Sequence, residues 1–512
     1  MPKRKRGPIE NGAGTQNGIS KQHKSSNPRN ETVNASEAHT QDTYIQVITG
    51  SYERVLHGFT VAIPPKRLSN PSEASPEVKV ADTFLFNAHT SAIRCVAVSP
   101  SLKSPESKNK LVLASGSTDE RINLYQLSTS PPSRGSKPSL PSLTGATVSE
   151  NRKNRELGSL LHHASSVTAL YWPQRGKLMS AAEDNTIAVT RSRDWTVLST
   201  IKAPMPAAVG RPSGDTAAAG DTPAGVNDFA VHPSMKLMVS VGKGEKCVRL
   251  WNLMTGKKAG VLNFEKDMLQ KVGEGKWGSG EGRKVVWDKE GTEFAIAFER
   301  GVAIYDLNSK PKLRIVPQPR TKIHEISYLP DLEKKVLVLS TEDGRILFYS
   351  TEANSSNDLK SSETQPAWKS LPECILLGQI GGKTDNITGR IKDFQILPLS
   401  SEDESSVDQA LVVAGSSDGA VRTWCLNLEE LVSSETANGT INGVNGDSAE
   451  KEKSKNEEVK SMGTLIKTYE TGNRITCLTA FIMTGSADSE EDDDGASQQE
   501  EKEGSDSDSD SS

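Results

Sequence analysis

The sequence predicts an all-β fold in which seven four-stranded blades close into a ring. Three observations predict it. A phrase made of a β-rich run, a tight turn of Ser, Gly and Asp, and a second β-rich run recurs six times, and such repetition is typical of repeat architectures. The two ends of the chain together supply a seventh copy. No convincing amphipathic helix separates the copies, which argues against alternating strands and helices.

The six internal copies have the pattern of β-hairpins, because each half is short and each turn holds residues that tolerate positive φ. They cover residues 111–127, 177–192, 236–253, 293–307, 336–350 and 411–426. A strand-like run precedes each hairpin, at 92–100, 166–173, 225–233, 282–290, 322–330 and 390–398. The link to the next copy supplies a fourth strand, as at 158–164 and 257–264. Each copy is therefore expected to form one four-stranded blade.

The seventh copy is divided between the ends of the chain. Residues 473–481 look like the first strand of a copy, and no further strand-like run follows them. Residues 43–63 read as a hairpin with no strand before it. Pairing the two would close the ring and remove the exposed sheet edges that invite aggregation. We therefore predict a last blade built from both ends of the chain.

Composition divides the chain into a ring and two polar ends. Only 34% of the residues are hydrophobic, which predicts that a sizeable part is loop or tail. Residues 1–42 are predicted as a disordered basic head, residues 43–482 as the ring, and residues 483–512 as a disordered acidic tail of Ser, Asp and Glu, because the two ends have little apolar surface to bury. Long polar loops are expected on the rims of the ring, at 128–156, 203–224, 351–370 and 428–460.

The sequence lacks the features of a membrane protein or an exported protein. No apolar run approaches the roughly 20 residues that span a bilayer, and no apolar stretch follows the basic N-terminus as in an export signal. The five cysteines are scattered and odd in number, which favours reduced thiols in a reducing compartment. We expect no contact with a membrane.

The first hairpin copy raises the question of catalysis. The spacing of four residues would suit either the catalytic set of a hydrolase or a structural cluster. These residues are His89, Ser115, Asp119 and Tyr125. A catalytic set should occur once, whereas partial copies of this one recur. A nucleophilic serine also needs exposure on a strained turn and an oxyanion hole, and Ser115 lies in an apolar strand. We interpret the group as structural.

This group resembles the tetrad of WD-repeat β-propellers, in which a loop histidine, a strand serine, a turn aspartate and an aromatic residue are joined by hydrogen bonds inside a blade. The resemblance implies a seven-bladed WD-repeat β-propeller. Pairing inside the tetrad satisfies polar groups that would be costly to bury alone. The matching residues of later copies are His163, Ser180, Asp184, Ser240, Trp251, Asp343, Tyr349, Asp418 and Trp424. Thr190 stands where an aromatic residue is expected, and Glu245 lies near the aspartate position of a turn with one extra residue.

Two glycine-containing segments partly match the motifs of nucleotide sites. Residues 273–278 match GxGxxG, but a loop and a strand follow where a helix is required. Residues 374–389 place a strand before a Gly-Lys-Thr triplet, but they lack the leading glycine and the following helix of a P-loop. No Asp, Glu, His or Cys cluster has convincing metal-ligand spacing. We expect no cofactor, no metal and no enzymatic activity.

The ends of the chain favour a nuclear protein. Lys3, Arg4, Lys5 and Arg6 form a compact basic cluster of the kind that nuclear import receptors bind. The tail alternates serine with acidic residues, and phosphorylation would add to its negative charge. Both features are also compatible with an ordinary solvated terminus.

The order of phrases along residues 43–482 is similar to that of the PAK-interacting-protein-1-like family of WD-repeat proteins, which has a fungal member. The segment "HPSMKLMVSVGKGEKCVRLWNLMTGK" (232–257) is the most specific part. The resemblance implies a scaffold of the nucleus and nucleolus that assists assembly of the large (60S) ribosomal subunit and rRNA processing, as a monomer within the pre-60S particle, where it binds assembly proteins and rRNA. Arg390, Lys392 and Arg474 are candidate contacts with RNA or a partner. The alternative that the resemblance leaves open is an adaptor that negatively regulates a PAK-type kinase.

Overall fold

The computed structural model describes residues 42–69, 76–101, 110–131, 147–148, 151, 153–205, 224–275, 278–330, 332, 334–352, 371–399, 409–431 and 460–484. Most of the predicted head, tail and polar loops lies outside these residues, including the cluster Lys3, Arg4, Lys5 and Arg6. The disorder of the head and tail therefore stays a prediction.

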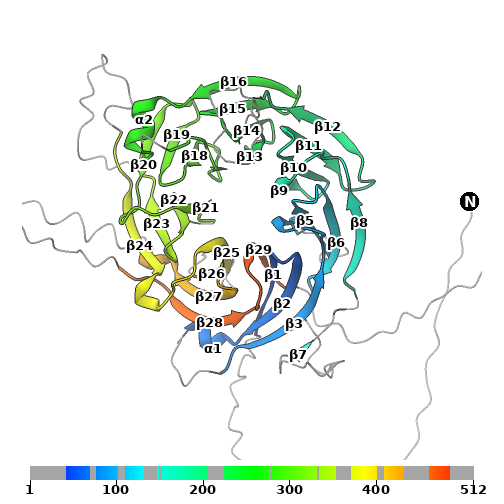
Figure 1. Ribbon diagram of the computed structural model, residues 1–512. Coiled ribbons are helices and arrows are strands. Elements are labelled where there is room, and N and C mark those ends of the chain that lie inside the picture. The colour runs from blue at the N-terminus through cyan, green and yellow to red at the C-terminus, as the bar shows by residue number, and fades with distance from the viewer. Residues whose placement is uncertain are drawn as a thin grey trace, which may run out of the picture. The chain divides into compact units, whose positions relative to one another are not determined.

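The described residues form the predicted ring of seven antiparallel blades (Figure 1). From the inner to the outer strand, blade 1 holds β29 (Ile475–Ile482), β1 (Thr43–Ser51), β2 (Val55–Ile63) and β3 (Lys79–Asn87); blade 2 holds β4 (Ile93–Val98), β5 (Lys110–Ser117), β6 (Ile122–Ser128) and β8 (Arg155–Leu160); blade 3 holds β9 (Val167–Gln174), β10 (Lys177–Ala182), β11 (Thr186–Arg191) and β12 (Val197–Lys202); and blade 4 holds β13 (Val226–Val231), β14 (Leu237–Gly242), β15 (Cys247–Asn252) and β16 (Lys257–Asn263).

The remaining blades continue in the same order. Blade 5 holds β17 (Lys284–Trp287), β18 (Glu293–Ala297), β19 (Val302–Asp306) and β20 (Pro311–Ile315); blade 6 holds β21 (Ile323–Tyr328), β22 (Val336–Thr341), β23 (Arg345–Ser350) and β24 (Ile375–Gly381); and blade 7 holds β25 (Ile391–Leu399), β26 (Gln409–Ser416), β27 (Ala420–Asn427) and β28 (Thr464–Glu470). The six hairpins predicted from the sequence are the middle strands of blades 2 to 7.

Blade 1 closes the ring as predicted. The C-terminal strand β29 pairs antiparallel with β1 near the N-terminus, in a register that sets Ile45 opposite Ile482 and Gly50 opposite Cys477 (Figure 1). Strands β1 and β2 are almost wholly buried. Because neither end of the chain can form this blade alone, closure couples the two ends of the ring.

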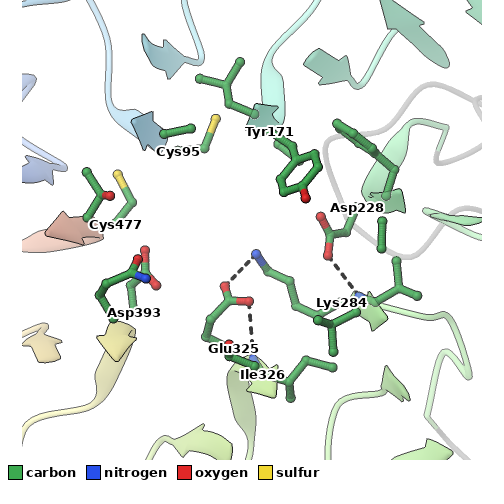
Figure 2. Close-up of a pocket in the computed structure, with 18 of the residues that line it drawn as sticks. Cys95, Tyr171, Asp228, Lys284, Glu325, Ile326, Asp393 and Cys477 are labelled. Carbon is green, nitrogen blue, oxygen red and sulfur yellow. Dashed lines mark hydrogen bonds and ion pairs between the residues drawn. The ribbon is translucent and has the colours of Figure 1, made fainter. Parts of the chain in front are cut away.

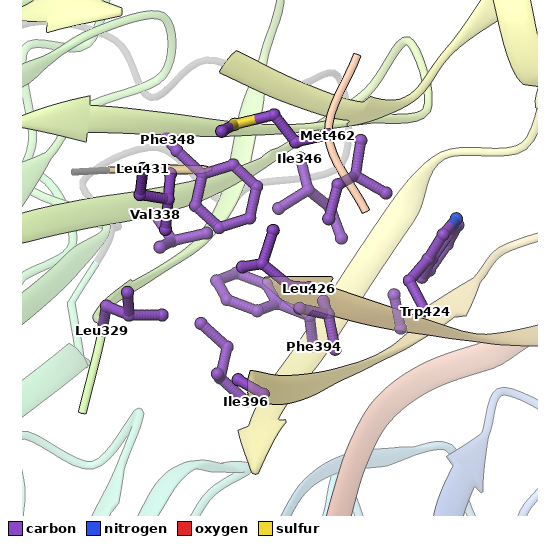
Figure 3. Packing of buried hydrophobic residues seen from close by; sticks show 14 of the residues in the cluster. Leu329, Val338, Ile346, Phe348, Phe394, Ile396, Trp424, Leu426, Leu431 and Met462 are labelled. Carbon is purple, nitrogen blue, oxygen red and sulfur yellow. The ribbon is translucent and has the colours of Figure 1, made fainter. Parts of the chain in front are cut away.

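Apolar side chains fill the spaces between neighbouring blades. Between blades 6 and 7, Phe348 of β23 packs near Phe394 of β25 and Leu426 of β27 (Figure 3). Leu428 and Leu431 also lie in this cluster, although they fall within the segment 428–460 that the sequence analysis describes as a polar loop. The segment is polar on average, so its composition does not indicate that these two leucines are buried.

Four blades are also joined at their outer edges, in a way that the repeat pattern does not reveal. In blades 1, 2, 6 and 7, described residues of the connection from the third to the fourth strand contact the outer strand of the preceding blade. The contacts are Glu77 with Lys467, β7 (Thr147–Val148) with β3, Glu373 with Arg314, and Ser461 with Gln379. The contacts lie on the outer strands of blades 7, 1, 5 and 6, whose edges could otherwise pair with another chain.

Helices are few and short among the described residues. They are α1 (Pro65–Ser69), α2 (Lys266–Lys271) and the 3-10 turn η3 (Lys383–Asp385). The helix α2 was not expected; it buries Met268 and Leu269 in the cluster between blades 4 and 5. In the part of the chain that the structure describes, none of the helices has the length and apolar character needed to cross a membrane.

Candidate functional site

The polar group of blade 2 is assembled around His89. The carboxylate of Asp119 lies 3.1 Å from Nδ1 of His89, and Oγ of Ser115 lies 2.8 Å from Nε2. Because an ionised carboxylate only accepts hydrogen bonds, Nδ1 carries the proton and the Ser115 hydroxyl donates to Nε2. Asp119 also accepts from the backbone N–H groups of Thr90 at 3.0 Å and Arg121 at 3.1 Å. The group therefore ties a loop, a strand and a turn together.

This group has no nucleophile that a substrate could reach. Ser115 is fully buried, and its hydroxyl is engaged by His89. Burial raises the pKa of Tyr125 to about 12, the charge of Glu156 adds to the rise, and hydrogen bonds with Asn123 and Ser115 oppose it. A buried phenol and a buried hydroxyl in one network stabilise the blade, and the arrangement does not match an exposed serine beside an oxyanion hole.

Blade 3 repeats the group with one change. His163 lies 2.8 Å from Oγ of Ser180 and 3.2 Å from the carboxylate of Asp184. A second histidine, His162, which sequence reasoning missed, lies 3.0 Å from the same serine oxygen. Thr190, which stands in the aromatic position, is buried, and among the described residues its hydroxyl has no partner.

Blade 4 keeps the aromatic half of the group and replaces the other half. The indole N–H of Trp251 donates to Oγ of Ser240 at 2.8 Å. Glu245, in the lengthened turn, forms a nearly buried ion pair with Arg249 four residues later. The arginine thus supplies the partner that a histidine supplies in blades 2 and 3.

Blades 6 and 7 satisfy their turn aspartates within one hairpin. Asp343 accepts from the guanidinium of Arg345, and Asp418 accepts from Arg422 at 3.3 Å and from the hydroxyl of Ser416 at 2.6 Å. The aromatic residues expected beside these aspartates pack among apolar side chains instead, and they are Tyr349 and Trp424. The predicted aspartates and aromatic residues are therefore present, but the structure does not bring them into one network.

A central channel of about 1140 Å³ is lined by the inner strands of the blades (Figure 2). It is lined by ionisable side chains that sequence reasoning missed. Nζ of Lys284 lies 2.7 Å from Glu325, whereas Asp228 accepts a hydrogen bond from the backbone N–H of Val285 at 2.9 Å. Burial raises the pKa of Asp228 to about 6. For Asp393, burial and then the charge of Glu325 raise the pKa to about 7.

The three predicted RNA or partner contacts lie together at one end of this channel. Arg390 and Arg474 immediately precede the inner strands β25 and β29, and Lys392 is the second residue of β25. Nε of Arg390 lies 3.1 Å from Glu342, and the guanidinium of Arg474 lies 5.6 Å from the ring centroid of Tyr52. Burial lowers the pKa of Lys392, and the charges of Arg390 and Arg474 lower it further. The end of the channel that they form is called the basic mouth below.

The two glycine-containing segments do not take the geometry of nucleotide sites. After β24 the chain makes only the three-residue turn η3 before β25, so no helix N-terminus is available there for a phosphate. Helix α2 comes before residues 273–278, and the strand β17 comes after them. Within the described ranges, no group of three His, Cys, Asp or Glu residues is arranged to hold a metal ion.

Comparison with known proteins agrees with this architecture. The family model "WD domain, G-beta repeat" matches residues 81–126 and 154–190. The chain is 27% identical to "Protein MAK11" of Saccharomyces cerevisiae over 76% of this chain and 79% of the relative. It is 24% identical to "p21-activated protein kinase-interacting protein 1-like" of Danio rerio over 78% of each chain. It is 22% identical to "Shk1 kinase-binding protein 15" of Schizosaccharomyces pombe over 59% of this chain and 68% of the relative.

The matches and the structure agree on the same repeat. The matched residues include most of blade 2, nearly all of the three inner strands of blade 3, and the tetrad residues His89, Ser115, Asp119, His163 and Ser180. Propellers of this family are typically non-enzymatic scaffolds. The chain is a seven-bladed WD-repeat β-propeller that belongs, as a distant homologue, to the family of MAK11 and the p21-activated protein kinase-interacting protein 1.

Proposed function

We propose that this protein is a non-enzymatic scaffold of the nucleolus that assists assembly of the large (60S) ribosomal subunit by binding assembly proteins and rRNA. The family relationship, which covers 76% of the chain in one relative and 78% in another, carries the proposal. A closed propeller offers many loops on a rigid frame, and such frames suit binding of several partners at once.

The chemistry of the ring supports a binding role. The histidine, serine and aspartate of blade 2 are hydrogen-bonded to one another in a buried network. Arg390, Lys392 and Arg474 gather at one end of the channel, where an anionic partner would be attracted. We include no cofactor or metal in the proposed function, and we expect one copy of the protein in each particle.

Nuclear and nucleolar residence forms part of the proposal. The basic cluster Lys3–Arg6 has the composition of a nuclear import sequence, and the acidic tail could compete with RNA for basic partners. Replacing Lys3, Arg4, Lys5 and Arg6 together by alanine should move a fluorescently tagged protein from the nucleus to the cytoplasm. Unchanged nuclear accumulation would remove this cluster from the proposal.

Depletion of the protein tests the assembly role directly. We expect the ratio of 60S to 40S subunits to fall in sucrose gradients, and the tagged protein to sediment with 60S precursors that contain unprocessed rRNA. Re-expression of the wild-type chain should restore the ratio. A normal ratio after complete depletion would contradict the proposal.

A second candidate function is an adaptor that negatively regulates a PAK-type kinase. The observation that favours it is the similarity to two relatives named as a kinase-interacting protein and a kinase-binding protein. Purified full-length protein should then bind the purified regulatory region of such a kinase and lower its activity. Absence of binding between the purified components would contradict this candidate, whatever the result of the depletion experiment.

A further inference from the structure

We infer that the basic mouth is a binding site for single-stranded RNA, with cations that hold phosphates and Tyr52 as the surface on which one base stacks. This inference rests on the proposed function, because it specifies how the scaffold would contact rRNA. It adds Tyr52, Arg283, Lys322 and His324 to the three contacts that the sequence indicates.

The topology of the ring gathers these side chains from four blades. Arg283, Lys322, Arg390 and Arg474 each immediately precede the inner strand of blades 5, 6, 7 and 1. The inner strands of all blades surround one channel (Figure 1). Their first residues therefore lie at one end of it. Residues from widely separated parts of the sequence therefore lie on four neighbouring blades at the same rim.

Irregular pairing between the inner and second strands of blades 6 and 7 directs additional charged side chains into the channel. The register between inner and second strand shifts between Ile323 and Ile326 in blade 6. In blade 7 it shifts between Ile391 and Asp393. At such a bulge two successive residues can face the same side. As a result His324 with Glu325, and Lys392 with Asp393, all line the channel.

The carboxylates at the rim do not balance the positive charge of the mouth. Glu299 lies 2.8 Å from Lys322 and 3.8 Å from Arg283, and it is shared between these two cations. Glu342 pairs with Arg390. Glu53 accepts from the backbone N–H of Arg474, at 2.9 Å. At the rim, three carboxylates thus lie beside the five cations Arg283, Lys322, Arg390, Lys392 and Arg474. Inside the channel Glu325 pairs with Lys284, and burial raises the pKa values of Asp228 and Asp393.

The lowered pKa of His324, which lines the channel, is consistent with this excess of positive charge. Burial lowers its pKa to about 4, and the charges of Lys392, Arg390, Arg283 and Lys322 all act in the same direction. The imidazole is therefore neutral at neutral pH, and its buried Nε2 atom has no hydrogen-bond partner among the described residues. A phosphate would offset the repulsion among the cations and offer acceptor oxygens to this ring.

Tyr52 decides between RNA and an acidic protein segment as the occupant. Its side chain is 61% exposed, and it lies in the turn between β1 and β2. A backbone hydrogen bond from Tyr52 N–H to the carbonyl of Arg474, at 2.9 Å, holds the turn beside the arginine, whose guanidinium lies over the tyrosine ring. Positive grooves that hold single strands pair cations with exposed aromatic rings, because bases stack and carboxylates do not.

The site is tested by fluorescence anisotropy with the full-length protein and a labelled oligouridine of about a dozen nucleotides, a length that suits one such site. Affinity should fall as salt is raised from about 50 to 200 mM. In Lys392→Ala and Arg390→Ala the slope of log affinity against log salt should be reduced by roughly 0.7 for each phosphate that the removed cation neutralised. Tyr52→Ala should weaken binding about 5-fold or more with an unchanged slope, and Tyr52→Phe should bind as the wild type does.

Lys236→Ala provides the matched control. Lys236 is an exposed cation that immediately precedes β14, at the end of the channel opposite the basic mouth, so its removal should leave affinity and slope unchanged. Equal binding by wild type and the mouth variants, or an equal loss in Lys236→Ala, would overturn the inference. So would competition at lower concentration by a peptide of tail residues 485–512 than by unlabelled oligouridine, because the mouth would then prefer acidic polypeptide. If the mouth variants lose RNA binding and still support normal 60S levels, the RNA site is confirmed and its role in assembly is contradicted.

Discussion

The carboxylate of Asp393, in the inner strand of blade 7, accepts a hydrogen bond at 2.8 Å from the backbone N–H of Leu478, in the strand that closes the ring. The same carboxylate accepts from the backbone N–H of Phe394 at 2.8 Å. Burial and the charge of Glu325 nevertheless raise its pKa to about 7. The closure of the ring therefore depends in part on a carboxylate that takes up a proton near neutral pH.

The first prediction concerns pH. An aspartate of the unfolded chain has a pKa of about 3.9, so between about pH 4 and pH 7 the folded protein binds more protons at Asp393 than the unfolded chain does. The free energy of unfolding contributed by this group therefore decreases as the pH rises through that window. Asp393→Asn removes the titration and keeps an oxygen that accepts from Leu478. Between about pH 5 and pH 8, the variant should lose less thermal stability than the wild type.

Asp194→Asn is the control for this measurement. Asp194 is an exposed turn aspartate, and hydrogen bonds from Thr196 lower its pKa, so its titration acts below the chosen window. The control should keep the pH dependence of the wild type. Identical pH dependence in Asp393→Asn and wild type would mean that this carboxylate titrates normally in the folded ring.

The second prediction concerns the tetrad of blade 2. Asp119→Ala removes the acceptor at Nδ1 of His89 and at the backbone N–H groups of Thr90 and Arg121. Leaving the buried Nδ1–H group of His89 unsatisfied should lower the free energy of unfolding by about 1–3 kcal/mol. Chemical denaturation measures it, and the exposed Asp194→Ala should change stability less. Equal stability of Asp119→Ala and wild type would argue that the tetrad contributes nothing.

The third prediction concerns the seam of the ring. A Cβ atom at Gly50, in β1, would lie 2.6 Å from Sγ of Cys477 and 2.7 Å from a methyl carbon of Ile93. Gly50→Ala should therefore destabilise the protein by about 1–3 kcal/mol through overpacking. At Gly176, in a turn of blade 3, a Cβ atom meets nothing within 4 Å. Gly176→Ala should have a neutral or slightly stabilising effect, and equal melting of the two variants would contradict the packing at the seam.

The fourth prediction separates two buried tryptophans. The indole N–H of Trp251 donates to Ser240 at 2.8 Å, whereas the indole N–H of Trp424 has no partner in the part of the chain that the structure describes. Replacement by phenylalanine removes the same volume at both sites. Trp251→Phe should cost about 1–3 kcal/mol more than Trp424→Phe, because it leaves a buried hydroxyl with one partner fewer. Equal losses in urea unfolding would show that the hydrogen bond in blade 4 has no net value.

The repeated phrases and their spacing determine much of this protein by themselves. Three signals predict the seven blades and their closure: alternating apolar residues, the turn residues, and the two half-copies at the ends. They suffice because a hairpin and its turn are local in the sequence. His89, Ser115 and Asp119 were recognisable for the same reason. In each case the partners belong to one blade, and blade geometry converts a spacing in the sequence into a distance.

Only the tertiary structure decided features that join different blades or replace a missing partner. Arg249, Arg345 and Arg422 take the place of a histidine, and no spacing rule for the tetrad would select them. Asp228 and Glu325 come to line the same channel as Lys284 because inner strands of different blades converge there. The register shifts that turn pairs of residues inward are set by packing between strands. The basic mouth thus arises from ring closure, which brings Arg283 and Arg474, far apart in the sequence, to the same rim.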